Sequence, residues 1–208
     1  MNYNPISRFS IKEFLSFKGL VLYLVGVVFM PLGVVFTINA HLGAGGYDAL
    51  NFAIADRLNI DVSYSIYLTA GLVVLITAAI RRQFPRLTTF VTSFFLGLTT
   101  NMWKSLCSTI QSDVLWIQIL IFIFGLIIIA FAVAAYILSK FPTNPTDDFV
   151  VALTEKKWPV RYAKMFLDGI CVVLAFILGG EIGFGTILCT LGLGPIIDVF
   201  LKYIKRVL

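Results

Sequence analysis

The sequence predicts an all-α membrane protein in which six transmembrane helices form two inverted-topology repeats of three helices each. Its composition is the first observation: 59% of the 208 residues are hydrophobic, 13% are charged, and the mean hydropathy is +0.95. An ordinary soluble domain is only about 45–50% apolar and about 25% charged. The chain therefore carries more apolar surface than a soluble core can bury, which indicates a lipid environment.

The second observation is a set of six apolar runs that approach or reach the length needed to cross a hydrocarbon core about 30 Å thick. The runs cover residues 19–40, 62–80, 87–106, 114–138, 162–178 and 182–201. Because the bilayer interior offers no water to the backbone, each run is expected to be a helix. Three runs lie in each half, and an odd number forces the second half to cross the membrane in the opposite direction.

The third observation is a recurrence along the chain. Gly26 recurs as Gly125 after 99 residues, and the turn and acid at 45–48 recur at 144–147. Internal repetition of this kind is typical of inverted-repeat membrane proteins. We therefore divide the chain into a first repeat, 19–110, and a second, inverted repeat, 111–208.

Residues 1–18 precede the first apolar run. Ser10 and Glu13 have the spacing of a capping box, and Phe9 and Phe14 are placed to form a hydrophobic staple. This pattern predicts a cytoplasmic amphipathic segment with a short interfacial helix over 10–18. A frayed cytoplasmic tail is the alternative.

The first long helix of each repeat is followed by an irregular turn and a short helix. The turns cover residues 42–46 and 141–145, and the short helices are expected over 47–58 and 146–156. Glycines in the first copy and prolines in the second end one helix and start another. The short helices are predicted to be interrupted or interfacial rather than membrane-spanning.

Two acids fall in the first turns of these short helices. Asp48 follows Tyr47, and Asp147 lies three residues after Asn144. A carboxylate in a first turn can simply cap the helix and complement its dipole. Inverted-repeat transporters, however, place their sites where interrupted helices meet. The two interpretations are compatible, and we predict a substrate- or ion-binding site that includes these four residues.

Asp168 lies inside the fifth apolar run. A carboxylate in hydrocarbon costs about 2.5–3.5 kcal/mol even on the insertion scale, so it should face the interior of the bundle. Lys164 and Arg161 lie four and seven residues earlier on the same helix face and are candidate partners. Asp168 is therefore either half of a structural ion pair or an ion-coupling group.

The last helices of the two repeats match with an offset of 97 residues, which pairs Asn101 with Asp198. Both are added to the candidate site, although an ion pair with Lys202 is the simpler account of Asp198. The segment 192–195, which ends in Pro195, is predicted to break or kink the last helix.

Basic residues set the orientation of the chain. With the N-terminus inside, every Lys and Arg except Arg57 and Lys104 lies in the cytoplasm. We therefore expect a multi-pass protein of the bacterial inner membrane with both termini cytoplasmic. The excess of basic residues then reports topology and contact with anionic lipid rather than nucleic-acid binding.

The sequence contains no pattern typical of a catalytic or metal site. Cys107, Cys171 and Cys189 show no paired spacing, and His41 is the sole histidine. Paired Ser/His motifs and Gly-rich phosphate loops are also missing. We therefore predict no enzyme activity, no metal and no cofactor.

Several segments resemble the YczE/YitT-type group of small bacterial integral membrane proteins. They are 42–50, 144–148, 179–180, 183–186 and 193–198, which cover the turns of both halves and most of the sixth run. The family usually has Pro-Trp-Asp in the first turn, where this chain has Gly46-Tyr47-Asp48. The resemblance implies a polytopic inner-membrane protein; it implies little about activity, because some members are linked only to control of secondary-metabolite production.

Two functional hypotheses follow. The first is a small secondary transporter or exporter of a small molecule or ion, with a site near the midplane. The second is a membrane-embedded accessory or regulatory protein that acts through a partner and transports nothing. In both, the lipid bilayer is the principal partner, and the high phenylalanine content favours a homodimer.

Overall fold

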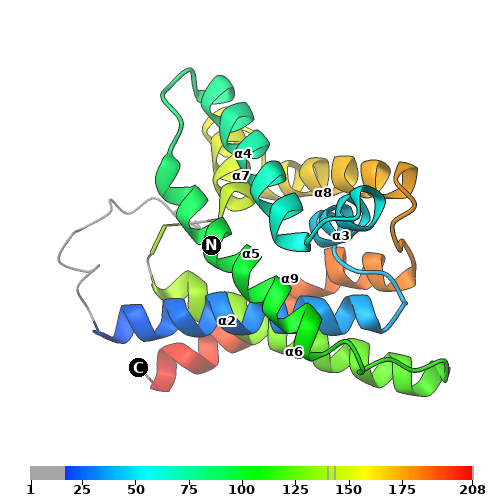
Figure 1. Ribbon diagram of the computed structural model, residues 1–208. Helices are drawn as coiled ribbons and strands as arrows, with labels where there is room; N and C mark the ends of the chain where they lie inside the picture. The colour runs from blue at the N-terminus through cyan, green and yellow to red at the C-terminus, as the bar shows by residue number, and fades with distance from the viewer. Residues whose placement is uncertain (1–16, 140, 143, 208) are drawn as a thin grey trace.

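The computed structural model describes residues 17–139, 141–142 and 144–207 (Figure 1). The regular elements of this part of the chain are all helices, joined by turns and loops. The helical class predicted from the sequence is confirmed. The predicted interfacial helix over 10–18 falls almost wholly outside the described residues. The elements are α2 (Phe17–Asn39), α3 (Gly46–Leu58), α4 (Val62–Arg81), α5 (Leu87–Leu106), α6 (Leu115–Ser139), α7 (Pro145–Glu155), α8 (Val160–Ile177) and α9 (Phe184–Val207).

Each of the six predicted runs forms a helix, and each predicted short helix is present as α3 or α7. Of the break or kink expected at 192–195, the break is wrong, because α9 continues through Pro195 to Val207. Proline removes a single backbone hydrogen bond, which a long helix held by its neighbours tolerates. Helix α2 likewise continues through Pro31.

Four of the described helices, α2, α4, α6 and α9, are long and apolar enough to cross a membrane. Helices α5 and α8 form where the sequence predicts them but do not meet that criterion. In α8 the reason is charge, since Arg161, Lys164 and Asp168 all lie on it. The arrangement of six spans therefore stays a prediction at this point.

The centre of the fold is the close crossing of α2 and α6. A methyl group on Gly33 would lie 2.7 Å from the carbonyl oxygen of Gly125, and one on Gly125 would lie 2.8 Å from that of Gly33. Small residues at such a crossing let two helix backbones touch, as they commonly do in membrane proteins. The crossing depends on glycine at both positions.

Two of the remaining helices pack directly on this pair, and the others lie to one side of it (Figure 1). Helix α5 packs on α2 and α9 packs on α6, while α3 and α7 each contact both α4 and α8. In Figure 1, α2 and α8 run from left to right, and α6 and α9 run from right to left. The described chain therefore begins and ends on the same side of the molecule.

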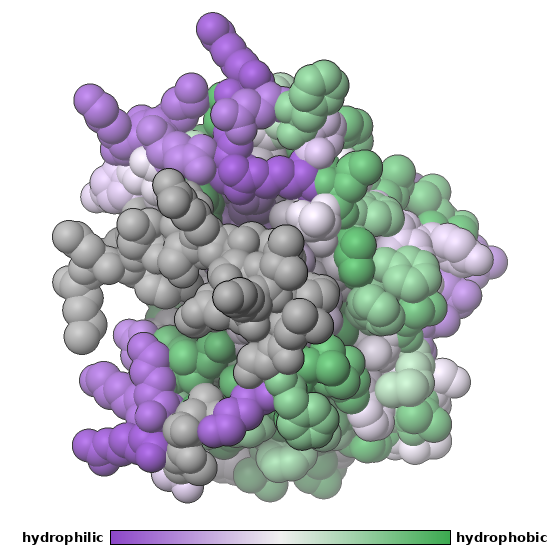
Figure 2. Space-filling view, turned by 90° about the vertical axis from the view of Figure 1, so that its left-hand side faces the viewer, coloured by the Kyte–Doolittle hydropathy of each residue, from purple (hydrophilic) through white to green (hydrophobic). Residues whose placement is uncertain are grey.

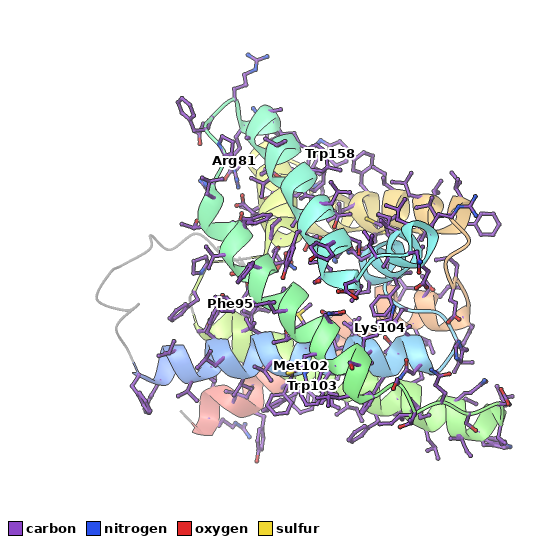
Figure 3. All side chains as sticks on the ribbon, in the orientation of Figure 1. Arg81, Phe95, Met102, Trp103, Lys104 and Trp158 are labelled. Carbon is purple, nitrogen blue, oxygen red and sulfur yellow. The ribbon has the colours of Figure 1, made fainter. Side chains whose placement is uncertain are left out.

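The outer surface of the assembly is strongly apolar. Phe95, Ile123 and Phe176 are 44%, 48% and 73% exposed, and many other large apolar side chains are exposed with them. Phe95 projects outward from α5 in Figure 3. Figure 2 views the molecule from the end where α2 begins. Hydrophilic residues lie mainly on the left of this view, and hydrophobic residues lie mainly on the right. Apolar patches of this extent mark a surface that lipid covers.

Candidate functional site

The two candidate acids occupy the same position in two short helices. Asp48 is the third residue of α3, after the cap residue Gly45, and Asp147 is the third residue of α7, after the cap residue Asn144. Within the described residues, neither carboxylate makes a hydrogen bond or an ion pair. Hydrogen-bonded capping therefore does not account for them, although both carboxylates still complement the dipoles of their helices.

Both acids line a cavity of about 380 Å³ that lies between the two halves of the chain. Of the predicted site residues, the structure brings five together in its wall: Tyr47, Asp48, Asn144, Asp147 and Asp168. Residues from both halves of the chain thus line one space. A volume of this size falls in the range of small-molecule sites.

Asn101 and Asp198 do not line the cavity. On α5 the cavity-lining side chains are Ser93, Leu96 and Thr100, which share one helix face. Asn101 is the next residue after Thr100 and is rotated about 100° away from that face. Asp198 is exposed, and no ion pair with Lys202 forms among the residues that are described.

Asp168 has the partner that the sequence predicts. Its Oδ1 lies 3.1 Å from Nζ of Lys164, one helical turn earlier on α8. The side chain of Asp168 is 9% exposed and that of Lys164 is 50% exposed, and both residues line the cavity. The side chain of Arg161, the other candidate partner, falls outside the described part of the chain.

The charges of the described side chains around the cavity do not balance. Among these residues, three carboxylates and one ammonium group line the cavity, and the ammonium group of Lys164 already contacts Asp168. Asp48 and Asp147 remain without a contacting cation. Asp48 is partly buried and Asp147 is exposed. Burial raises the pKa of Asp48 to about 7, and the nearby Lys164 offsets only part of this effect. A bound cation would stabilise the charged form of the acids, so the cavity favours positive charge.

Hydrogen bonds fix the polar wall of the cavity. The Tyr47 hydroxyl lies 3.0 Å from Oγ1 of Thr69, and Thr69 donates to Oδ1 of Asn51 at 2.6 Å. Ser93 donates to Oδ1 of Asn144 at 3.4 Å. Thr69, Asn51 and Ser93 were not predicted as site residues. Isolated polar residues inside apolar helices are the one signal in the sequence that could have identified them.

The opposite wall is apolar. It is formed where α2 and α6 cross, by side chains that the sequence analysis did not single out: Met30, Val34, Ile129 and Val133. The cavity is therefore amphipathic, with acids and amides on one side and hydrocarbon on the other. This division follows from the fold, because α2 and α6 are the most apolar of the described helices.

The turn that leads into α3 is held against the start of α9. The backbone N–H of Gly185 donates to the carbonyl oxygen of Leu42 at 2.7 Å. Gly43 has φ of +98°, a conformation that favours glycine. Two segments of the family resemblance, 42–50 and 183–186, are therefore in contact, and together they set the position of Asp48.

An ion-pair network that the sequence analysis missed holds α7 to the end of α4. Arg81 donates from Nη1 to Oδ2 of Asp148 at 2.7 Å and from Nε to Oε2 of Glu155 at 2.8 Å. Arg86 reaches Oδ1 of Asp148 at 3.3 Å. The Arg81 side chain is only 4% exposed and lies where α4 meets α7 (Figure 3). Because Asp148 follows Asp147, the network also positions the cavity acid.

No cluster of three or more His, Cys, Asp or Glu side chains could hold a metal ion among the residues described. Cys107, Cys171 and Cys189 are buried and free. His41 contacts Glu181 at 2.7 Å through Nδ1, on an exposed part of the surface away from the cavity.

Comparisons with known proteins identify the family of this chain. The model of a family of unknown function, DUF6198, matches residues 17–202. The uncharacterized protein YyaS of Bacillus subtilis is 26% identical over 88% of this chain and 92% of its own length. An uncharacterized protein of Haemophilus influenzae is 23% identical over 92% of this chain and 87% of its own length.

A further relative is described as a membrane protein. The uncharacterized membrane protein YczE of Bacillus subtilis is 24% identical over 84% of this chain and 81% of its own length. No solved structure matches the chain. The resemblance to YczE predicted from the sequence is confirmed, and the chain belongs to the DUF6198 family as a helical integral membrane protein.

Proposed function

We propose that the protein is a small secondary transporter whose solute site is the cavity between two inverted three-helix repeats. One observation carries the proposal: the N-terminal turns of two short helices, α3 and α7, meet at a cavity with two unpaired carboxylates at equivalent positions. Interrupted helices that meet at a polar cavity are the usual construction of a transporter site. Soluble solutes need such a polar surface to cross lipid.

The composition of the cavity wall supports the inverted arrangement. Most of its residues have an equivalent in the other repeat that also lines the cavity. Equivalent residues are 99 positions apart from the first helix of the repeat to its short helix, and 97 positions apart in the last helix. Examples are Met30 and Ile129, Val34 and Val133, Asp48 and Asp147, Ser93 and Thr190, and Leu96 and Leu193. Pairs of this kind are expected when a two-fold axis passes through the cavity.

Helix packing supports it as well. The contact of α2 with α5 has its counterpart in α6 with α9, and the contact of α3 with α8 has its counterpart in α7 with α4. At the central crossing, Gly26 lies against Tyr136, and its equivalent Gly125 lies against Thr37, the equivalent of Tyr136. The α2 and α6 helices run in opposite directions in Figure 1.

The proposal places the protein in the bacterial inner membrane with six spans, α5 and α8 included, and with both termini in the cytoplasm. The distribution of basic residues supports this orientation. The charged residues of α8 are consistent with a span because Lys164 and Asp168 pair and face the cavity rather than lipid. Charged groups within transmembrane helices almost always face the bundle interior or a water-filled cavity.

Accessibility of the cavity from the two sides of the membrane tests transport without knowledge of the solute. Single cysteines are introduced as Ser93→Cys and Thr190→Cys after Cys107, Cys171 and Cys189 have been replaced. A membrane-impermeant methanethiosulfonate reagent is then applied to right-side-out and to inside-out vesicles. We expect both positions to react from both sides, because a transporter opens its site alternately to each.

Leu98→Cys is the matched control for this experiment. Leu98 lies on the same helix as Ser93 and is 48% exposed, but it lies outside the cavity wall and faces lipid. It is expected to stay unmodified, since the reagent attacks a hydrated thiolate. If Ser93→Cys and Thr190→Cys react from one side only, the protein does not alternate, and the accessory role becomes the better account.

A further inference from the structure

We propose that the cavity binds a small amphiphilic organic cation, with a substituted ammonium group beside Asp48 and Asp147 and an apolar body against the crossing of α2 and α6. The inference rests on the proposed function in so far as it takes this cavity as the solute site. It adds the chemical class of the solute.

The sign of the charge follows from the pairing inside the cavity. Lys164 is engaged with Asp168 at 3.1 Å, while Asp48 and Asp147 have neither a hydrogen bond nor an ion pair among the described residues. A bound monocation near these acids would offset part of the repulsion that each of them experiences from Asp168. An anion would meet two carboxylates, and the one ammonium group among the described lining residues, that of Lys164, is already paired with Asp168.

The helix termini do not reverse this conclusion. The N-terminus of an isolated helix attracts anions through its free N–H groups and its dipole. In α3 and α7, however, an aspartate occupies the third position of the helix. Each helix therefore carries its own negative charge at its positive end, and the net field at the cavity is that of the carboxylates.

The apolar wall indicates an organic solute rather than a bare metal ion. Met30, Val34, Ile129 and Val133 form hydrocarbon surface that a hydrated ion would not use. The part of the chain described here also lacks a cluster of ligands suited to a metal. Tyr136 also lines the cavity and interacts electrostatically with Asp147, and an aromatic ring there adds attraction for a substituted ammonium group. The volume of about 380 Å³ suits a small amphiphile.

Binding of hexyltrimethylammonium to the full-length protein in nanodiscs tests the inference. Isothermal titration measures its affinity, and hexanesulfonate, an anion with the same tail, is the matched probe. Empty nanodiscs correct for partition into lipid. We expect saturable binding of the cation and none of the anion. We also expect Asp48→Asn and Asp147→Asn each to weaken binding at least about tenfold, which corresponds to about 1.4 kcal/mol.

Two control variants separate charge from folding. Asp48→Glu keeps the charge and is expected to bind within about threefold of the parent protein. Asp198→Asn removes an exposed carboxylate outside the cavity and is expected to change nothing. Size-exclusion profiles of all variants report whether the fold is kept. If the asparagine variants do not fold, the comparison of the cation with hexanesulfonate on the parent protein decides the sign of the charge that the cavity binds.

Each outcome has a defined meaning. Saturable binding of hexanesulfonate in place of the cation overturns the inference, and so does full affinity in both asparagine variants or a lack of cation binding by the parent protein. The transport proposal is judged separately by cysteine accessibility. If the cavity opens to both sides but does not bind the cation, the result contradicts the cation proposal and leaves transport standing. If the cavity binds the cation but opens to one side only, the result contradicts transport and leaves the cation proposal standing.

Discussion

Replacement of Arg81 by methionine is expected to lower the free energy of unfolding by about 3–5 kcal/mol, the usual cost of removing one partner from a buried ion pair. The variant leaves Asp148, whose side chain is 8% exposed, without its closest cation. Arg86 compensates little, because it is 47% exposed and reaches Asp148 only at 3.3 Å. Methionine keeps much of the volume of arginine, so loss of charge dominates the effect.

An SDS-unfolding titration in mixed micelles measures this change. Lys104→Met is the control, because Lys104 pairs with Asp56 at 3.4 Å and the two side chains are 40% and 73% exposed. An exposed pair contributes about 0–1 kcal/mol, so the control variant should stay close to the parent protein. Equal effects of the two substitutions would show that the Arg81 network does not hold α7 to α4.

Replacement of Gly33 by alanine is the second large effect that we expect. The added methyl group would lie 2.7 Å from the carbonyl oxygen of Gly125 and 2.8 Å from the backbone nitrogen of Ile129. Backbone atoms cannot turn aside as a flexible side chain can, so α2 and α6 must separate. Overpacking of this kind costs about 1–3 kcal/mol, and the separation would also alter the apolar wall of the cavity.

Gly192→Ala serves as the matched substitution for that experiment. Gly192 also lies inside a long helix, but a methyl group there meets nothing within 4 Å. Alanine favours a helix over glycine by about 1 kcal/mol, so this variant should be neutral or slightly more stable. Unfolding titrations of both variants decide the matter: a destabilisation by Gly192→Ala as large as that by Gly33→Ala would refute the close crossing as the cause.

The helices, and the position of Asp48 and Asp147 in the first turns of two short helices, could be predicted from the sequence because both depend on local patterns. Apolar length places the long helices, and the glycines and prolines of the turns start the short ones. The pairing of Asp168 with Lys164 was also predictable, since residues four apart share a helix face.

The remaining features depend on how distant helices pack. Arg81 and Asp148 are 67 residues apart, and nothing local in the sequence pairs them. Asn101 was assigned to the site by its offset from Asp198, but helical rotation turns it away from the face that carries Thr100. An offset identifies equivalent residues in two repeats; it does not tell which face of the helix they occupy.

Topology at two equivalent positions tests the inverted repeat most directly. Arg57 and Lys156 are 99 residues apart, both are exposed, and each lies at the end of its short helix. In intact cells a membrane-impermeant maleimide should label Arg57→Cys in a cysteine-free background, whereas Lys156→Cys should be labelled only after the membrane is permeabilised. Labelling of both positions from the same side would contradict the inverted repeat.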